Sequence, residues 1–167
     1  MKHSCIHIYC GNGKGKSTAA VGLSVRAKGA GLTCACFFFL KNGSSNETPM
    51  LKSLGIHTQT APHSDKFIWN MDEAEKQQFF AAQHDLFLQA TQYPCDVLIL
   101  DEVLDACALG IVSKEELQAF LQQSTAEIVL TGRNGSDFAE LADYYTVMTA
   151  QKHPYDNGLP ARKGIEF

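Results

Sequence analysis

The sequence has few charged residues and no long hydrophobic run. Its 14 Lys and Arg against 18 Asp and Glu give a formal net charge of −4, and charged residues make up only 19% of the chain. A mildly acidic chain lacks the basic surface that general nucleic-acid binding needs. The longest apolar run, Cys34 to Leu40, is far shorter than the ~20 residues that cross a bilayer. With 45% hydrophobic residues, the chain is expected to be a soluble protein that binds neither nucleic acid nor membrane.

Targeting and redox motifs are also lacking. The N-terminal stretch carries two His in its short apolar part and meets a glycine-rich loop at once, which is unlike a signal peptide. The cytoplasm is therefore the expected location. The six Cys include no C-x-x-C pair and mostly lie in or beside apolar segments, which favours reduced, packed thiols over disulfides.

The order of apolar segments indicates one α/β domain over residues 1–167, with 151–167 as a C-terminal tail or flap. Runs of strand length alternate with helical patterns, which is typical of a mostly parallel sheet with helices on both faces. The expected strands are 5–10, 32–40, 56–60, 96–101, 127–131 and 145–149. The expected helices are 17–30, 71–93 with Asn70 as cap and Glu73 in a capping box, a helix to Gln123 capped by Ser113 with Glu116, and a short one to Asp143 capped by Ser136. Residues 41–49 and 61–70 are expected to be loops.

The strongest chemical motif is CGNGKGKST, residues 10–18, between an apolar strand and an Ala-rich helix. Its glycines let the backbone curl with N–H groups pointing inward, and the helix start adds a positive dipole end, so the loop can bind phosphate. Lys16 can bridge phosphate charge, and the Ser17 hydroxyl can ligate Mg²⁺. The candidate nucleotide-binding residues are Gly11, Asn12, Gly13, Lys14, Gly15, Lys16, Ser17 and Thr18. A glycine-rich turn without ligand is the alternative.

One position departs from the usual phosphate-loop pattern. The first glycine should stand five positions before Gly15, where this chain has Cys10. We therefore expect the loop to wrap a triphosphate differently from a standard ATPase.

Charged residues follow two further apolar strands. VLILDE delivers Asp101 and Glu102 at a strand end, where ligands of parallel sheets bind, and a carboxylate there can hold Mg²⁺ directly or through water. EIVLTGR places Arg133 at the same edge, where its guanidinium can clamp a phosphate. The acidic pair could instead be only a helix cap, and Arg133 only a surface residue.

Together these motifs resemble the ATP:corrinoid (cob(I)alamin) adenosyltransferases of the phosphate-loop type. The resemblance runs nearly end to end and rests on GNGKGKST, GAG, FIW, LILDE, LTGR, LADYYTVM and KHPYDNGLPARKGIEF. It implies a P-loop, RecA-like fold and transfer of the 5′-deoxyadenosyl group of ATP to cob(I)alamin, forming adenosylcobalamin and releasing triphosphate. It also implies Mg²⁺, a cytoplasmic homodimer and, as a further partner, a reduced flavoprotein or ferredoxin-type electron donor.

The resemblance also implies roles for particular residues. Lys16 and Ser17 hold triphosphate and Mg²⁺, Glu102 belongs to the metal site, and Arg133 lies near the phosphates. Phe67 and Trp69 match the aromatic pair that packs against the corrinoid and removes its lower axial ligand. On residue type alone, such a pair in a loop would more often be a hydrophobic anchor. The implied catalytic residues are Phe67, Trp69, Lys16 and Arg133.

Two other functions remain open at this point. One is a small P-loop kinase or NTPase that cleaves the terminal phosphate of its nucleotide. The other is a non-catalytic protein that binds nucleotide and corrinoid without forming a cobalt–carbon bond. Longer relatives carry an N-terminal extension that can cover the partner subunit's site, and we expect no such lid here, because the first strand follows Met1 closely.

Overall fold

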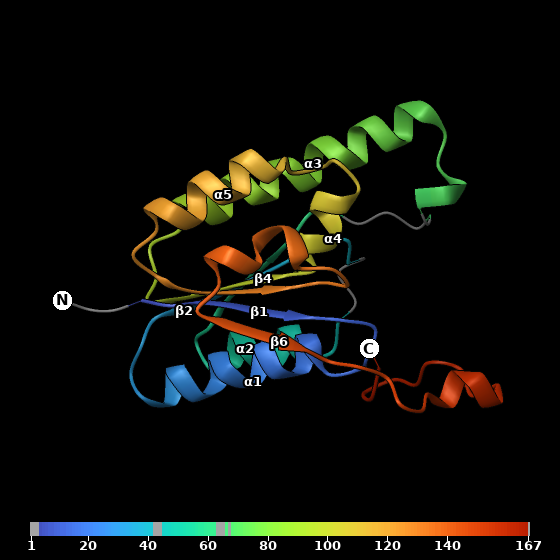
Figure 1. Ribbon diagram of the computed structural model, residues 1–167, viewed down its shortest axis with the longest axis horizontal. Helices are drawn as coiled ribbons and strands as arrows, with labels where there is room; N and C mark the ends of the chain where they lie inside the picture. The colour runs from blue at the N-terminus through green and yellow to red at the C-terminus, as the bar shows by residue number, and fades with distance from the viewer. Residues whose placement is uncertain (1–3, 42–44, 63–65, 67, 167) are drawn as a thin grey trace.

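The chain forms a six-stranded sheet with helices on both faces (Figure 1). The structure is a computed structural model that describes residues 4–41, 45–62, 66 and 68–166. The strand order is β3-β2-β4-β5-β1-β6, and every pairing is parallel. The strands are β1 (Ile6–Cys10), β2 (Cys34–Phe38), β3 (His57–Thr60), β4 (Val97–Asp101), β5 (Glu127–Thr131) and β6 (Tyr144–Val147). The expected α/β class with a parallel sheet is confirmed.

Helices cover the two faces of this sheet unequally. Helices α1 (Lys16–Gly29) and α2 (Glu47–Ser53) lie on one face, and α3 (Glu73–Gln92), α4 (Val103–Ala108) and α5 (Lys114–Gln123) lie on the other. Short 3₁₀ turns complete the chain: η1 (Ile68–Asn70), η2 (Ser136–Leu141) and η3 (Pro154–Asn157). Because all strands run the same way, their carboxyl ends meet at one edge of the sheet, on the right in Figure 1.

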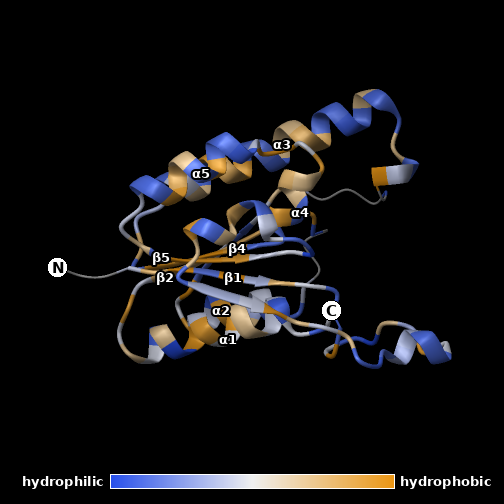
Figure 2. Ribbon diagram, viewed as in Figure 1, coloured by the Kyte–Doolittle hydropathy of each residue, from blue (hydrophilic) through white to orange (hydrophobic). Residues whose placement is uncertain are grey.

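The core consists of two apolar layers, one on each face of the sheet. Every residue of β2 and β4 is buried, as expected for strands that are covered on both sides. Neighbouring residues alternate between the layers: Phe37 packs on the α3 side and Phe38 on the α1 side. Figure 2 shows the hydrophobic colour concentrated in β2, β4 and β5. At the edge, every residue of β6 is exposed.

Two helical segments differ from the sequence-based expectation. Residues 47–49 were expected in a loop but begin α2, because Leu51 in that helix is buried in the core and Pro49 stands in the first turn, where it is tolerated. Helix α4 was not expected at all. Its short sequence, VLDACA, is separated from β4 by Glu102 alone, and three of its six residues are buried.

The expected cap of α3 was wrong, and so was that of the short helix near residue 140. Asp72 caps α3 and forms a capping box with Glu75, because Asn70 belongs to the 3₁₀ turn η1. Ser136 is the first residue of η2 and makes no side-chain cap, since Gly135 occupies the cap position. The left-handed stop of α1 at Gly31 (φ 86°) is confirmed.

The expected capping box of α5 is confirmed. The Glu116 backbone N–H donates to Ser113 Oγ (3.2 Å), and the Ser113 N–H donates to Glu116 Oε2 (2.9 Å). His84 Nε2 of α3 lies 2.9 Å from Glu116 Oε1. The hydrogen bonds from Ser113, followed by that from His84, lower the pKa of Glu116 to about 2. This carboxylate therefore ties the start of α5 to α3.

Replacing Glu116 by Gln is expected to lower the free energy of unfolding by about 0.5 kcal/mol at neutral pH, a small loss because the side chain is 42% exposed and screened. Because the pKa of Glu116 is lower in the folded protein than its ordinary value of 4.5, its carboxylate stabilises the fold at pH values above 4.5. This contribution is lost as the pH falls toward about 2. Urea unfolding at about pH 7 and about pH 2 measures the difference. Glu115→Gln in the same helical turn is the control, and a loss of equal size at both pH values would contradict the assignment.

Candidate nucleotide-binding and active site

The motifs that follow β1, β2, β4 and β5 meet at the carboxyl edge of the sheet. The glycine loop follows β1, Lys41 follows β2, Glu102 follows β4 and Arg133 follows β5. Strand β5 lies between β1 and β4, so the loop and the acidic pair are separated by one strand. Ligands of open parallel sheets bind at this edge, at the point where successive connections diverge.

The backbone of residues 11–15 has the conformation that its glycines permit. Gly11 and Gly15 have φ values of 107° and 118°, in the region that favours glycine. A Cβ atom on Gly11 would stand 2.3 Å from the carbonyl oxygen of Met148, and one on Gly13 would stand 2.8 Å from it. The loop therefore packs directly against the backbone that follows β6.

Hydrogen bonds fasten the loop to that segment. The Gly13 N–H donates to Met148 O (2.7 Å), and the Met148 N–H donates to Cys10 O (2.7 Å). The Asn12 side chain accepts from the Ala150 N–H (3.0 Å). Hydrogen bonds of Gly13 and Asn12 therefore fix the loop against the segment that follows β6.

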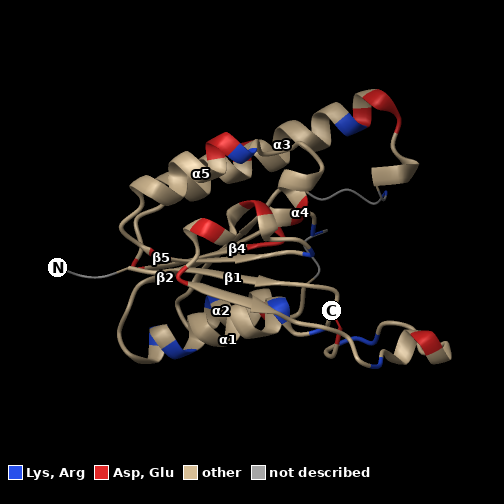
Figure 3. Cartoon of the chain, viewed as in Figure 1, with Lys and Arg blue, Asp and Glu red and all other residues tan. Residues whose placement is uncertain are grey.

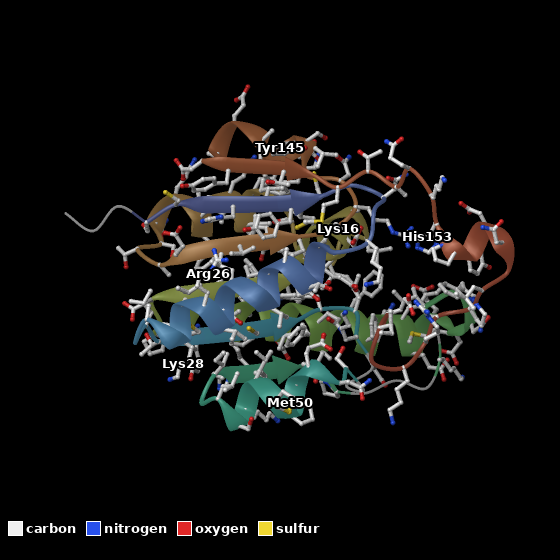
Figure 4. All side chains as sticks on the ribbon, turned by 90° about the horizontal axis from the view of Figure 1, so that it is seen from below. Lys16, Arg26, Lys28, Met50, Tyr145 and His153 are labelled. Atoms are coloured by element: carbon white, nitrogen blue, oxygen red, sulfur yellow. The ribbon has the colours of Figure 1, made fainter. Side chains whose placement is uncertain are left out.

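Helix α1 begins at Lys16 and has no acidic residue in its first turn. Its first N–H groups have no partner within the helix, so they are available to an anion along with the positive end of the helix dipole. The Lys16 ammonium donates to the Gly13 carbonyl (2.6 Å), which folds the side chain back over the loop. Figure 4 shows Lys16 and Lys28 at opposite ends of this helix.

Gly13→Ala is expected to weaken nucleotide binding at least about tenfold and to lower the free energy of unfolding by about 1–3 kcal/mol, because its Cβ would meet backbone rather than a flexible side chain. Calorimetric titration with ATP and urea unfolding measure the two effects. Gly22→Ala is the matched control, because a Cβ at that helical position meets nothing within 4 Å. The control should gain up to about 1 kcal/mol, and unchanged ATP affinity in Gly13→Ala would contradict the close packing of the loop.

The acidic pair at the end of β4 is part of a network that joins three strands. Asp101 is fully buried, and its Oδ1 accepts a hydrogen bond from Thr131 Oγ1 (2.7 Å) at the end of β5. Thr131 Oγ1 also accepts from the Glu102 N–H (2.8 Å). Lys41 Nζ lies 3.4 Å from Asp101 Oδ2 and 3.5 Å from Glu102 Oε1. The two carboxylates are thus positioned by backbone and side-chain contacts.

Burial raises the pKa of Glu102, Lys41 opposes this rise, and the charges of Asp101 and Asp105 add to it. Glu102 also adopts a left-handed backbone conformation (φ 63°). Such strain in a residue other than glycine is concentrated at functional sites. A cation bound beside Glu102 would reduce the repulsion among these carboxylates.

The residues at this edge fit Mg²⁺. Asp101 Oδ2 is buried and accepts no well-formed hydrogen bond within the described residues, so it has a lone pair for a cation. In the same part of the chain, no three His, Cys, Asp or Glu side chains form a metal-binding group. Mg²⁺ sites in nucleotide enzymes commonly use one or two carboxylates and take their other ligands from phosphate and water. Asp101 and Glu102 are carboxylates of that kind, and the Ser17 hydroxyl is a further oxygen donor at the start of α1.

Arg133 lies between the glycine loop and α4. Its N–H donates to both carboxylate oxygens of Asp105 (3.2 Å each), and its carbonyl accepts from the Gly11 N–H (2.9 Å). A Cβ on the preceding Gly132 would stand 2.5 Å from Leu104 Cβ, so a glycine is needed where α4 approaches. The structure therefore places the backbone of Arg133 beside the glycine loop, and the residue is exposed to solvent.

The structure places Trp69 apart from these residues. Trp69 belongs to η1 and is 75% exposed. In Figure 1, η1 precedes α3 at the tip of an extension beyond the sheet. Phe67 lies outside the described residues. The sheet edge thus unites Lys16, the acidic pair and Arg133, whereas Trp69 projects from a separate segment.

Three site residues were missed from the sequence: Lys41, Thr131 and Asp105. Lys41 fell in an expected loop, and only its position directly after an apolar run indicated a strand end. Thr131 belongs to the LTGR motif, which drew attention to Arg133 alone. Asp105 lies within a helix that was not expected. Pairing across neighbouring strands, which brings Phe38 beside Asp101, is what unites Lys41 with the acidic pair.

Three of the cysteines are poorly suited to nucleophilic chemistry. All six are free thiols, and burial raises the pKa of Cys36 to about 12, of Cys95 to about 11 and of Cys107 to about 12. Thiols with raised pKa values are weak nucleophiles at neutral pH.

No helix among the described residues combines the length and hydropathy needed to span a bilayer.

A family model and several curated relatives identify the family of this chain. The family model of ATP:corrinoid adenosyltransferase BtuR/CobO/CobP matches residues 2–167. A corrinoid adenosyltransferase of Escherichia coli K12 is 30% identical over 97% of this chain and 85% of its own length. The corrinoid adenosyltransferase CobA of Salmonella typhimurium is 31% identical with the same coverage, and one from Sinorhizobium is 30% identical over 97% of this chain and 79% of its own. The chain therefore belongs to the ATP:corrinoid adenosyltransferase family, whose P-loop, RecA-like architecture its sheet and glycine loop share.

Proposed function

We propose that this protein transfers the 5′-deoxyadenosyl group of ATP to the cobalt of cob(I)alamin or a related reduced corrinoid. The cobalt(I) electron pair forms the new cobalt–carbon bond, the C5′–O bond of ATP breaks, and triphosphate leaves with the electrons of that bond. The observation that carries the proposal is the glycine loop and helix start of α1, which share one sheet edge with the buried Asp101 and the half-buried Glu102. Family membership supports the same chemistry.

In this proposal, the protein mainly positions its substrates and stabilises the leaving group. Lys16, the first amides of α1 and Arg133 bind the triphosphate and stabilise the charge that it gains on leaving. The loop residues Asn12 to Gly15 shape this cradle. Ser17, Asp101 and Glu102 hold Mg²⁺, which when bound neutralises phosphate charge.

No protein nucleophile is required, because cobalt(I) is itself strongly nucleophilic. The raised thiol pKa values agree with this division of work. Holding the cobalt and C5′ in line supplies the proximity contribution to the rate. Catalysis therefore depends on geometry and electrostatics more than on acid–base groups.

Phe67 and Trp69 are proposed to pack against the corrinoid and displace its lower axial ligand. Loss of that donor lowers the orbital that receives an electron, so cob(II)alamin becomes easier to reduce. The high exposure of Trp69 supports a role toward a ligand more than toward the core. A reduced flavoprotein or ferredoxin-type donor would supply the electron. A cytoplasmic homodimer is the proposed form of the enzyme.

The C-terminal segment 151–167 is proposed to act as a flap of the same domain. Figure 3 shows residues of both charge signs along it. Arg162 and Glu166 form an ion pair (3.1 Å), and the positive charge of Lys14 in the glycine loop contributes to lowering the pKa of Glu166, after Arg162. These charges support the proposal that the segment lies close enough to the glycine loop to act as its flap.

Anaerobic incubation with ATP, Mg²⁺ and chemically reduced cobalamin tests the proposal. The expected result is a light-sensitive alkylated corrinoid, measured optically, together with one triphosphate per product. Release of ADP and phosphate without corrinoid would instead identify a kinase or NTPase. Binding of both ligands without an alkylated product would identify a carrier and overturn catalysis.

A further inference from the structure

The ammonium group of Lys41 forms ion pairs with two carboxylates, those of Asp101 and Glu102. Its Nζ lies 3.4 Å from Asp101 Oδ2 and 3.5 Å from Glu102 Oε1. The Lys41 side chain is 22% exposed, and its partner Asp101 is fully buried. The ion pair between Lys41 and Asp101 is therefore shielded from solvent. The Lys41 ammonium faces Asp101 Oδ2, the oxygen of that carboxylate that accepts no hydrogen bond within the described residues.

The backbone holds Lys41 in this place. Leu40 (φ 57°) and Glu102 (φ 63°) are the two non-glycine residues with positive φ in the described part of the chain, and both adjoin the ion cluster. The Phe39 N–H donates to Asp101 O (2.9 Å), and the Leu40 N–H donates to Oε1 of the fully buried Gln83 (3.1 Å). Two strained residues persist only where their surroundings determine them strongly. The position of Lys41 is thus built into the fold.

The charge of the cluster is not balanced by Lys41 alone. One ammonium faces the carboxylates of Asp101 and Glu102, and the charges of Asp105 and Glu47 also act on the cluster. A divalent cation would supply the missing positive charge, but it would need the carboxylate oxygens that Lys41 occupies. Two cations cannot share these oxygens without strong repulsion.

We propose that Lys41 is a built-in counter-ion that competes with the divalent metal for Asp101 and Glu102. It holds both carboxylates in place before metal-bound nucleotide arrives and moves off them when the metal binds. The role rests on the metal site in the proposed function. It makes Lys41 a positioning residue, which delays metal occupancy until a nucleotide adds phosphate ligands.

Binding of Mn²⁺ to the full chain, without nucleotide or corrinoid, tests this role through electron paramagnetic resonance of free Mn²⁺. Lys41→Met is expected to tighten Mn²⁺ binding about tenfold, because the competing charge is gone. Lys41→Gln, which keeps a hydrogen-bond donor near Asp101, should show the same gain. Lys41→Arg keeps the charge and should stay near the wild type. Lys28→Met, at the far end of α1, is the control and should change nothing.

Unchanged, weaker or undetectable Mn²⁺ binding in both neutral variants would overturn the proposal. Adding Glu102→Gln to Lys41→Met should remove the gain, which shows that the metal binds at the acidic pair. Circular dichroism and thermal melts establish that each variant is folded, and Lys41→Gln tests the proposal if Lys41→Met does not fold. Because no adenosyl transfer is measured, failure of the proposed reaction would leave this result unaffected.

Discussion

Replacing Lys16 by Ala is expected to lower ATP-dependent adenosyl transfer by about a thousandfold while leaving the fold intact. The ammonium lies over the glycine loop, where it donates to the Gly13 carbonyl. Its loss removes a cation that stabilises the departing triphosphate but removes no core volume. Initial rates at saturating ATP and reduced cobalamin measure the effect. The free energy of unfolding, measured by thermal melts, should change by less than about 1 kcal/mol.

Lys28→Ala is the matched control for Lys16→Ala. Lys28 belongs to the last turn of the same helix, at its opposite end (Figure 4), so both variants remove one lysine from α1. The control should keep full turnover. Retained turnover in Lys16→Ala at saturating ATP would contradict the proposed phosphate site.

Trp69→Ala is expected to slow the reaction that starts from cob(II)alamin and a reductant by about a hundredfold, and the reaction from chemically reduced cob(I)alamin much less. Only the first reaction requires removal of the lower axial ligand before reduction. Because Trp69 is 75% exposed, its replacement should leave stability nearly unchanged. Rates of alkylated product from each starting oxidation state give the comparison.

Two controls separate a cofactor contact from a merely structural role of Trp69. Trp69→Phe keeps an aromatic ring and should retain part of the cob(II)alamin reaction. Met50→Ala removes another exposed apolar side chain, 63% exposed on α2, and should affect neither reaction. Equal losses from both oxidation states in Trp69→Ala would show that the residue only holds its loop.

The elements of the fold could be predicted where a local pattern is unambiguous. The apolar runs of β1, β4 and β5 and the Ser113 cap of α5 lie within a residue or two of the expected places. Errors arose where a tertiary contact decides. Burial of Leu51 makes α2 helical, and the 3₁₀ turn at Asn70 moves the cap of α3 to Asp72.

The candidate site likewise has parts that could be predicted from local motifs and parts that depend on tertiary contacts. CGNGKGKST, LILDE and LTGR identified the loop, the acidic pair and Arg133, because each is a contiguous segment at a strand end. The approach of Met148 to the glycine loop and of Lys41 to Asp101 joins segments far apart in the chain. No pattern along the sequence carries that information.

By itself, the sequence determined the fold class, the position of the proposed phosphate-binding loop and the chemistry implied by its motifs, because these depend on residue type and local spacing. Only the tertiary structure decided which groups share the sheet edge, which loop amides are already bound to the chain, and which cation faces the acidic pair. The physical reason is that a parallel sheet orders its strands β3-β2-β4-β5-β1-β6. Neighbours in space are then set by strand pairing and core packing rather than by distance along the chain.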